Sequence, residues 1–338
     1  MLIVSFIGFQ NDTIHVSSKN QQLDIVLRDG VELNEVNIVT RKLGTMKLRS
    51  SVMNEDMISS AELSRAACCN LGESFVTNPS VDVSYSDAAT GAKQIKLLGL
   101  SGTYVQMLTE NIPNYRGAAA PYGLGYVPGP WMQSIQVSKG TSSVKNGYEA
   151  ITGQINVEFK KPQLPEADWV SANLFASTTN RYEANADATL KISKRWSTSL
   201  LAHYENETKA HDGNDDGFVD IPQVEQYNVW NRWAYMGDHY VFQAGIKALS
   251  ETRTSGQANH GGTMHSGDLY KVGIDTERYE FFTKNAYIFN KEKNTNLALI
   301  LSTTLHNQDA TYGRKLYNVD QTNVYALSLI HISEPTRR

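Results

Sequence analysis

The residues best suited to chemistry are the short oxygen donors between His211 and Gln223. They occupy alternate positions around Gly217, so several of them could converge on one hard cation while the glycine allows a sharp turn. This spacing predicts a calcium site. The bidentate glutamate that usually ends such a loop is replaced by Gln223, and no helical pattern flanks the segment, so a solvated acidic loop remains the alternative. The predicted ligands are Asp212, Asn214, Asp216, the Phe218 carbonyl and Asp220.

Two other groups of residues could bind metal, although neither pattern is specific. The adjacent Cys68 and Cys69 could form a vicinal disulfide or bind a soft metal, or they could be small buried residues at a helix end. His260 and His265 could bind a transition metal or be ordinary polar loop residues. No G-x-S-x-G, P-loop, H-E-x-x-H or C-x-x-C motif is present, so we predict that the protein is not an enzyme.

Long strands are the elements that would position the acidic loop. From Asp168 onward apolar and polar residues alternate, as in Arg181–Ile192, Arg195–Glu207, His239–Glu251 and Asn296–His306. Each run is about the 9–11 residues that a tilted membrane-spanning strand needs. We expect about eight antiparallel transmembrane strands, with acidic and histidine side chains facing the lumen. A barrel wide enough to enclose a domain needs on the order of 22 strands, so we expect an incomplete barrel that does not insert stably alone.

The connections between these strands sort by length. Short turns on one side and long loops on the other are typical of transmembrane barrels. Aromatic residues near strand ends, such as Trp196 and Trp230, suit the two membrane interfaces. The expected short connections are 193–194, 236–239 and 290–294, and the expected long or extended ones are 208–225, 252–276 and 308–321.

The first half of the chain has the pattern of a compact α+β domain. We expect a helix over Ser50–Cys69, followed by short strands and a long loop, Asn111–Pro130, rich in Gly, Ala and aromatic residues. Two strand-like runs, Ile135–Ser138 and Gln154–Phe159, then flank a turn-rich segment.

These two runs carry a pattern, I-x-V-x-K-G, then Tyr148-Glu149, then G-x-I-N-V. The pattern resembles the closing segment of the plug domain of TonB-dependent outer-membrane receptors, of the Bacteroidetes type. The resemblance implies a mostly β protein that extends beyond both ends of this sequence. The implied domains are the end of a carboxypeptidase-regulatory-like β-sandwich (1–30), a TonB-box-like linker (31–43), the plug domain (44–162), the N-terminal part of a transmembrane β-barrel (163–327) and a non-native tail (328–338).

The resemblance also implies a function and partners. Such a receptor imports a scarce large ligand across the outer membrane, foremost an iron-siderophore or other metal chelate, with cobalamin and copper left open. Energy would come from TonB, which would pair as an added strand with Glu35, Val36, Asn37, Ile38 and Val39. A passive porin or adhesin-like barrel without energy coupling is the alternative.

The long loop would lie at the plug apex in this resemblance. Arg116 would offer charge and the tyrosines ring faces to a ligand, whereas packing against the barrel wall is the alternative. The expected ligand-contacting residues are Tyr115, Arg116, Tyr122 and Tyr126.

Charge and hydropathy restrict the remaining partners. The formal net charge is -4, and no basic block stands out, so the sequence predicts no nucleic-acid partner. No apolar run is long enough for a transmembrane helix, but alternating barrel strands need no such run, so outer-membrane lipid remains an expected partner.

Overall fold

The computed structural model divides the chain into two units, Met1–Lys42 and Leu43–Arg338. In the first unit, β1 (Leu2–Val4) pairs antiparallel with β2 (Asp12–Ile14). The predicted linker and its TonB-contacting residues, Glu35 to Val39, lie outside the described residues. The structure describes residues 2–4, 12–14, 45–47, 54–66, 69–76, 78–100, 102–142, 144–164, 167–258, 269–290 and 295–332.

A mixed six-stranded sheet forms the centre of residues 45–164, which we call the plug region. Its middle strands are β9 (Met132–Lys139) and β10 (Gly153–Phe159), which pair antiparallel. Their inward residues Ile135, Val137, Ile155 and Val157 are fully buried, which explains why the sequence alternates so clearly here. The strand order is β3 (Thr45–Lys47), β4 (Asn54–Ser59), β9, β10, β7 (Val105–Thr109) and β8 (Ile112–Pro113).

The helix predicted over Ser50–Cys69 is wrong for its first part. β4 pairs with β9 from Asn54 to Ser59, and among the described residues of this range only α1 (Ser60–Arg65) is helical. Ile58 lies opposite Ile135 and is fully buried, so burial in the sheet outweighs the patchy helical spacing of the methionines.

The rest of the plug region is built from short elements. A separate hairpin pairs β5 (Val81–Asp87) with β6 (Ala92–Leu97). The short 3-10 helices are η1 (Leu71–Phe75), η2 (Gly102–Tyr104), η3 (Gly117–Ala119), η4 (Gly129–Trp131) and η5 (Val144–Asn146).

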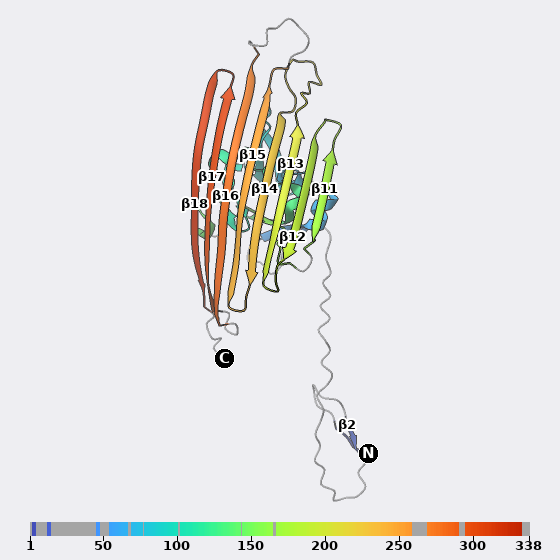
Figure 1. Ribbon diagram of the computed structural model, residues 1–338, viewed down its shortest axis with the longest axis vertical. Helices are drawn as coiled ribbons and strands as arrows, with labels where there is room; N and C mark the ends of the chain where they lie inside the picture. The colour runs from blue at the N-terminus through green and yellow to red at the C-terminus, as the bar shows by residue number, and fades with distance from the viewer. Residues whose placement is uncertain are drawn as a thin grey trace, which may run out of the picture. The chain divides into compact units, whose positions relative to one another are not determined.

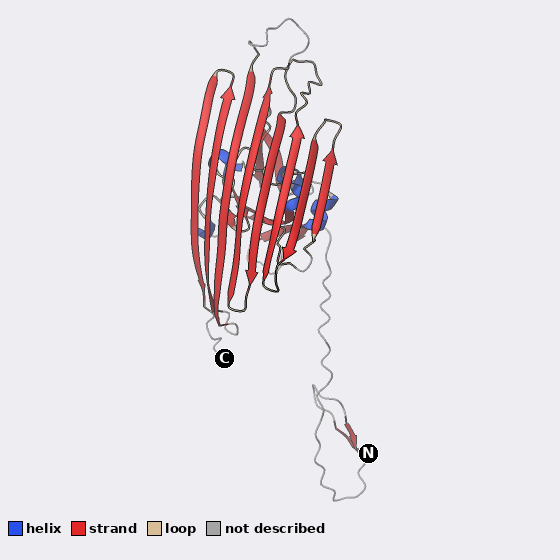
Figure 2. Ribbon diagram, viewed as in Figure 1, coloured by secondary structure: helices blue, strands red, loops and turns tan. Residues whose placement is uncertain are grey.

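Eight consecutive antiparallel strands follow, as expected, and form a curved sheet that we call the wall (Figures 1 and 2). Each strand pairs with its neighbour in sequence, and β11 and β18 are the two edges, so the sheet is not closed. No helix among the described residues is long and apolar enough to cross a membrane. The strands are β11 (Val170–Ala176), β12 (Tyr182–Lys191), β13 (Trp196–Glu207), β14 (Gln223–Met236), β15 (Tyr240–Gly256), β16 (Lys271–Asn290), β17 (Thr295–Tyr312) and β18 (Lys315–His331).

The later strands are longer than the sequence suggested. β16 has 20 residues and β17 has 18. The connection expected over 308–321 is wrong, because β17 and β18 stay paired up to Tyr312 and Lys315 and turn at Gly313, with φ of 60°. Beyond the apolar band, outward side chains face water and no longer need to be apolar, so a polar run still pairs as strand.

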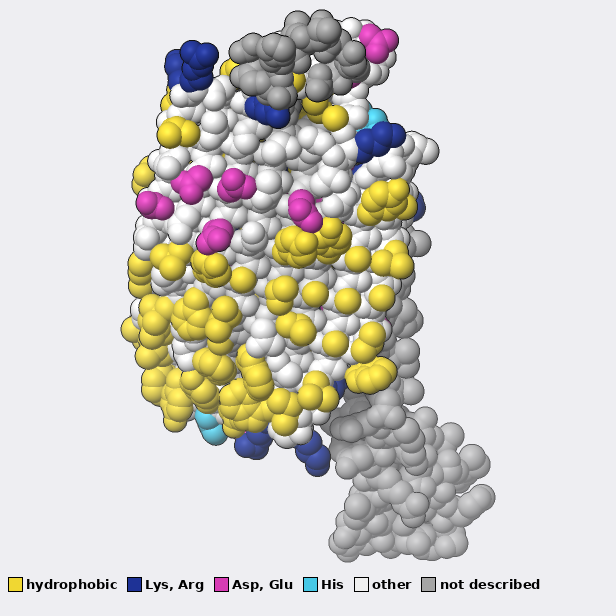
Figure 3. Space-filling model, turned by 45° about the horizontal axis from the view of Figure 1, so that its top comes forward, with side chains coloured by type: hydrophobic (Ala, Val, Ile, Leu, Met, Phe, Trp, Pro, Cys, Tyr) yellow, Lys and Arg dark blue, Asp and Glu magenta, His cyan; other side chains and the backbone are white. Residues whose placement is uncertain are grey.

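The two faces of the wall differ in the way the alternation predicts. Glu183, His203 and Lys247 are buried on the face toward the plug region, whereas Leu200 and Ile246 are exposed on the other. Figure 3 shows a broad apolar band on the outer face, with acidic side chains gathered above it. Apolar-out and polar-in alternation is the pattern of a transmembrane barrel.

Aromatic side chains mark one end of the apolar band. Trp196 lies near Trp233, Tyr235 and Phe242 around the short connection that precedes β15. Trp230 departs from the prediction because it points inward. Its ring packs edge-on to Phe159 at 4.5 Å, in space that Gly245 leaves free.

Candidate functional site

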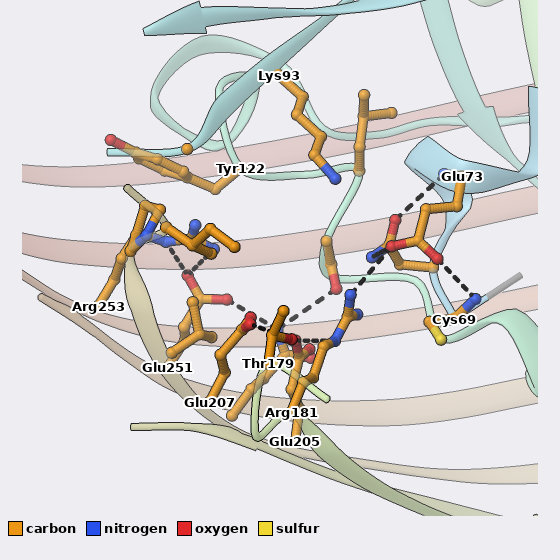
Figure 4. Close-up of a pocket in the computed structure, with 18 of the residues that line it drawn as sticks. Cys69, Glu73, Lys93, Tyr122, Thr179, Arg181, Glu205, Glu207, Glu251 and Arg253 are labelled. Atoms are coloured by element: carbon orange, nitrogen blue, oxygen red, sulfur yellow. Dashed lines mark hydrogen bonds and ion pairs between the residues drawn. The ribbon is translucent and has the colours of Figure 1, made fainter. Parts of the chain in front are cut away.

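A cavity of about 430 Å³ lies between the plug region and the wall. Wall residues line it near the end of β13, the start of β14 and the end of β15, beside the long 208–222 connection. It therefore opens at the end of the wall that carries the long connections. Its charged lining residues are Glu73, Lys93, Arg181, Glu205, Glu207, Glu251 and Arg253 (Figure 4).

Arg181, one residue before β12, joins the two sides of this cavity. Its guanidinium lies 3.0 Å from Glu73 of the plug region, 2.7 Å from Glu183 and 3.0 Å from Glu205. Glu73 is fixed from its own side, since the Cys69 amide donates to it at 3.0 Å. Arg181 is 16% exposed, so these charge-assisted contacts are partly shielded from water.

Arg253 forms a second charged contact across the cavity. Its guanidinium pairs with Glu251 at 3.1 Å and donates to the Thr90 carbonyl of the plug region at 3.1 Å. It also stacks on the Tyr122 ring, 5.0 Å from the ring centre. Gln226 donates to the other Glu251 oxygen at 2.8 Å, which completes the set of partners.

Lys93 of β6 differs from these two arginines. It makes no ion pair with a described residue, and Figure 4 shows its ammonium pointing toward the charged side chains of the wall. Its stem packs near Gly72, where an added Cβ would lie 3.3 Å from the lysine Cδ. Burial is the largest influence on this group and lowers the pKa of the ammonium.

Away from the cavity, polar wall residues contact the plug region through side chains that are largely buried. Arg232 lies 2.5 Å from Glu110, with both side chains 3% exposed, and Lys284 lies 3.5 Å from the same carboxylate. Burial alone would raise the pKa of Glu110, but Arg232 and Lys284 hold it below its ordinary value. Asn114, four residues further on, donates to Glu280 at 2.9 Å and accepts from Arg278.

The four residues predicted at the plug apex have different environments. Tyr115 and Tyr126 are buried against the wall, where Lys247 donates to the Tyr115 hydroxyl at 3.3 Å and to the Tyr126 carbonyl at 3.0 Å. This is the packing role that the sequence left as the alternative. Tyr122 lines the cavity, and Arg116 is half-buried and pairs with Glu149 at 2.8 Å.

The acidic loop keeps its predicted donors close together. The Asp212 carboxylate accepts from the amides of Asp216 and Gly217, and Asp220 accepts from the Gly213 amide at 2.6 Å. Gly217 has φ of 83°, as the sharp turn requires. Among the described residues no group of three or more His, Cys, Asp or Glu side chains is arranged as a metal site, and calcium binding stays a prediction.

The remaining candidate ligands are only partly described. Cys69 is a buried free thiol whose pKa is raised by burial and, to a smaller extent, by Glu183. Cys68, His260 and His265 lie outside the described residues.

Sequence reasoning missed the residues that form the cavity and the deep contacts, namely Lys93, Glu110, Arg181 and Arg253. Alternation places Glu205 and Glu251 inside the wall but does not say which plug residue faces them. Arg181 and Glu73 are 108 positions apart, and only the three-dimensional register brings them together.

Comparison with known proteins defines the class. Residues 47–154 match the family model described as TonB-dependent Receptor Plug Domain. This match identifies residues 47–154 as a plug domain of the TonB-dependent receptor kind, and the polar-in, apolar-out wall that follows it has the pattern of a transmembrane barrel.

Individual proteins are similar to this chain in sequence or in fold. The chain is 24% identical over 185 residues to the "Vitamin B12 transporter BtuB" of Vibrio vulnificus (strain CMCP6), a match that covers 55% of this chain and 30% of that protein. The outer-membrane ferripyoverdine receptor of Pseudomonas aeruginosa has the same fold, with a TM-score of 0.61 at 13% identity over 82% of this chain and 40% of that one. The ferric-catecholate import receptor Fiu of E. coli K12 has a TM-score of 0.58 at 16% identity, over 82% and 44%. The chain thus spans less than half the length of each of these proteins.

Proposed function

We propose that this protein is a receptor for active import of a large, scarce ligand across the outer membrane, energised by TonB. A metal chelate such as an iron-siderophore is the foremost ligand class, because several similar structures are siderophore receptors by name. BtuB and the copper transporter OprC keep cobalamin and copper open as ligands.

The observation that carries this proposal is the contact between a folded plug and a polar wall. The plug region meets the wall through a half-buried ion pair at Glu73 and a buried ion pair at Glu110, and a charged cavity opens at the end with long connections. A ligand entering this cavity would meet Tyr122 on the plug and Arg181 and Arg253 on the wall. A passive porin has no need of a plug held in this way.

Energy coupling can be tested directly through the predicted TonB-contacting segment. Deletion of residues 31–40 is expected to abolish accumulation of radiolabelled ferric siderophore by cells expressing the receptor, while surface binding persists. Loss of uptake in a strain without TonB should match the deletion. Uptake that continues at the same rate in both cases would support the porin or adhesin alternative and overturn the proposal.

A further inference from the structure

The cavity beside Tyr122 contains two charged groups that form no ion pair with the described part of the chain. Lys93 makes no ion pair with any described residue, and neither does Glu207, which only accepts a 3.4 Å hydrogen bond from Thr179. The other charges in the lining are already engaged: Arg181 with Glu73 and Glu205, and Arg253 with Glu251. The engaged residues fix the shape of the cavity and leave two groups to meet a ligand.

Lys93 is held in place without being neutralised. Its amide donates to the Pro121 carbonyl at 3.0 Å, and its ammonium lies 5.5 Å from the Tyr85 ring centre. Two aromatic rings, those of Tyr85 and Tyr122, line the same cavity. A cation fixed beside ring faces in a partly desolvated cavity is suited to an anionic, planar group.

The electrostatic environment supports this assignment. Burial lowers the pKa of Lys93. The positive charges of Arg181 and Arg253 lower it further, whereas the negative charges of Glu73 and Glu205 raise it. A bound anion would relieve this unfavourable environment, because it supplies the partner that a half-buried ammonium lacks.

We propose that the cavity binds a ligand of net negative charge, which presents an anionic group to Lys93 and a hydrogen-bond donor to Glu207. This inference rests on the proposed import function, which it narrows to anionic ligands. Ligands without net charge and free metal cations are disfavoured as cargo of this cavity.

The test measures binding of three probes to the receptor purified in detergent, by isothermal titration calorimetry. The probes are ferric tris-catecholate, which has a net negative charge, cyanocobalamin, whose phosphodiester charge is balanced within the molecule so that its net charge is zero, and Cu²⁺. We expect the anion to bind most tightly and Lys93→Met to weaken it about tenfold or more. Lys93→Arg should retain most of the affinity, which separates loss of charge from loss of fold. Lys96→Met, on the opposite face of β6, is the matched control and should leave affinity unchanged.

Three results would overturn the inference. They are absence of anion binding, anion binding that Lys93→Met leaves intact, and preferred binding of Cu²⁺ that Glu207→Gln abolishes. The outcome for import is separate. TonB-dependent uptake of cyanocobalamin would sustain the import function and refute this inference. Lys93-dependent anion binding without TonB-dependent uptake would sustain this inference and refute the import function.

Discussion

Glu110 of the plug region and Arg232 of β14 form a buried ion pair with a separation of 2.5 Å. The same arginine donates to the Lys160 carbonyl at 2.7 Å, at the junction between plug and wall. One wall side chain thus fixes two parts of the plug region that are 50 positions apart in sequence. Glu110 itself sits in a turn with φ of 51°, a backbone conformation that costs energy outside glycine and is held here by its partners.

Replacing Glu110 by Gln is expected to destabilise the plug region. The change leaves the Arg232 guanidinium buried without a counter-charge, for which a cost of about 3–5 kcal/mol is typical. Urea unfolding of the receptor in detergent, followed by tryptophan fluorescence, would measure the change in free energy of unfolding. The control is Arg195→Gln, which removes an exposed pair with Asp238 and should cost less than about 1 kcal/mol. Equal effects of the two variants would contradict the central role of the Glu110 pair.

The same pair predicts sensitivity to acid. The pKa of Glu110 is lower in the folded state than its ordinary value of 4.5, so its stabilising effect is complete above that value. The effect is lost as the pH falls through the lower, folded pKa, because the carboxylate must then take up a proton. Unfolding midpoints measured between about pH 6 and about pH 3 should fall more steeply for the wild type than for Glu110→Gln. Parallel profiles would show that Glu110 is not held in its charged form by the fold.

Packing around Trp230 gives a prediction that does not depend on charge. A Cβ added at Gly245 would lie 2.5 Å from Phe282 and 2.7 Å from the Trp230 indole nitrogen. Gly245→Ala should therefore destabilise the protein by about 1–3 kcal/mol through overpacking. Gly273→Ala on β16 is the matched control, because a Cβ there meets no atom within 4 Å. A stable Gly245→Ala variant would mean that the wall can shift locally around Trp230.

Calcium binding at the acidic loop predicts protection of the 208–222 connection from proteases. Millimolar Ca²⁺ should slow cleavage within this connection, and Mg²⁺ at the same concentration should do so far less, because it demands a stricter geometry. Asp216→Asn should remove the protection. Cleavage at the same rate with and without Ca²⁺ would leave the segment as a solvated acidic loop, whose carboxylates already accept backbone amides.

The sequence predicted the wall better than the plug, for a physical reason. Alternation in segments such as Arg181–Ile192 follows directly from one face meeting lipid and the other meeting the plug. Residues near Tyr317 do not alternate in this way, although they pair as strand, because their outward side chains face water and not lipid. In the plug, Ile58 and its neighbours become strand only because β9 lies beside them. That partner comes from far along the chain and leaves no local signal.

The candidate site was the least predictable part. The sequence predicted that the tyrosines of the long loop contact a ligand. In the structure, Tyr115 and Tyr126 instead accept hydrogen bonds from Lys247 of the wall. Lys93, by contrast, is one of two lysines in a short hairpin, and nothing in its own segment distinguishes it from Lys96.

The polar inner face of the wall has a mechanical consequence. Where Glu73, Thr90, Glu110 and Asn114 meet the wall, each contact is a hydrogen bond or ion pair that water can replace as the surfaces part. Hydration can thus enter these contacts one at a time, so that pulling on the plug meets many small barriers in succession. The apolar patch of Trp131, Phe159, Trp230 and Phe282 offers no such exchange. Separation there exposes dry surface, so this patch should be the last point at which plug and wall part.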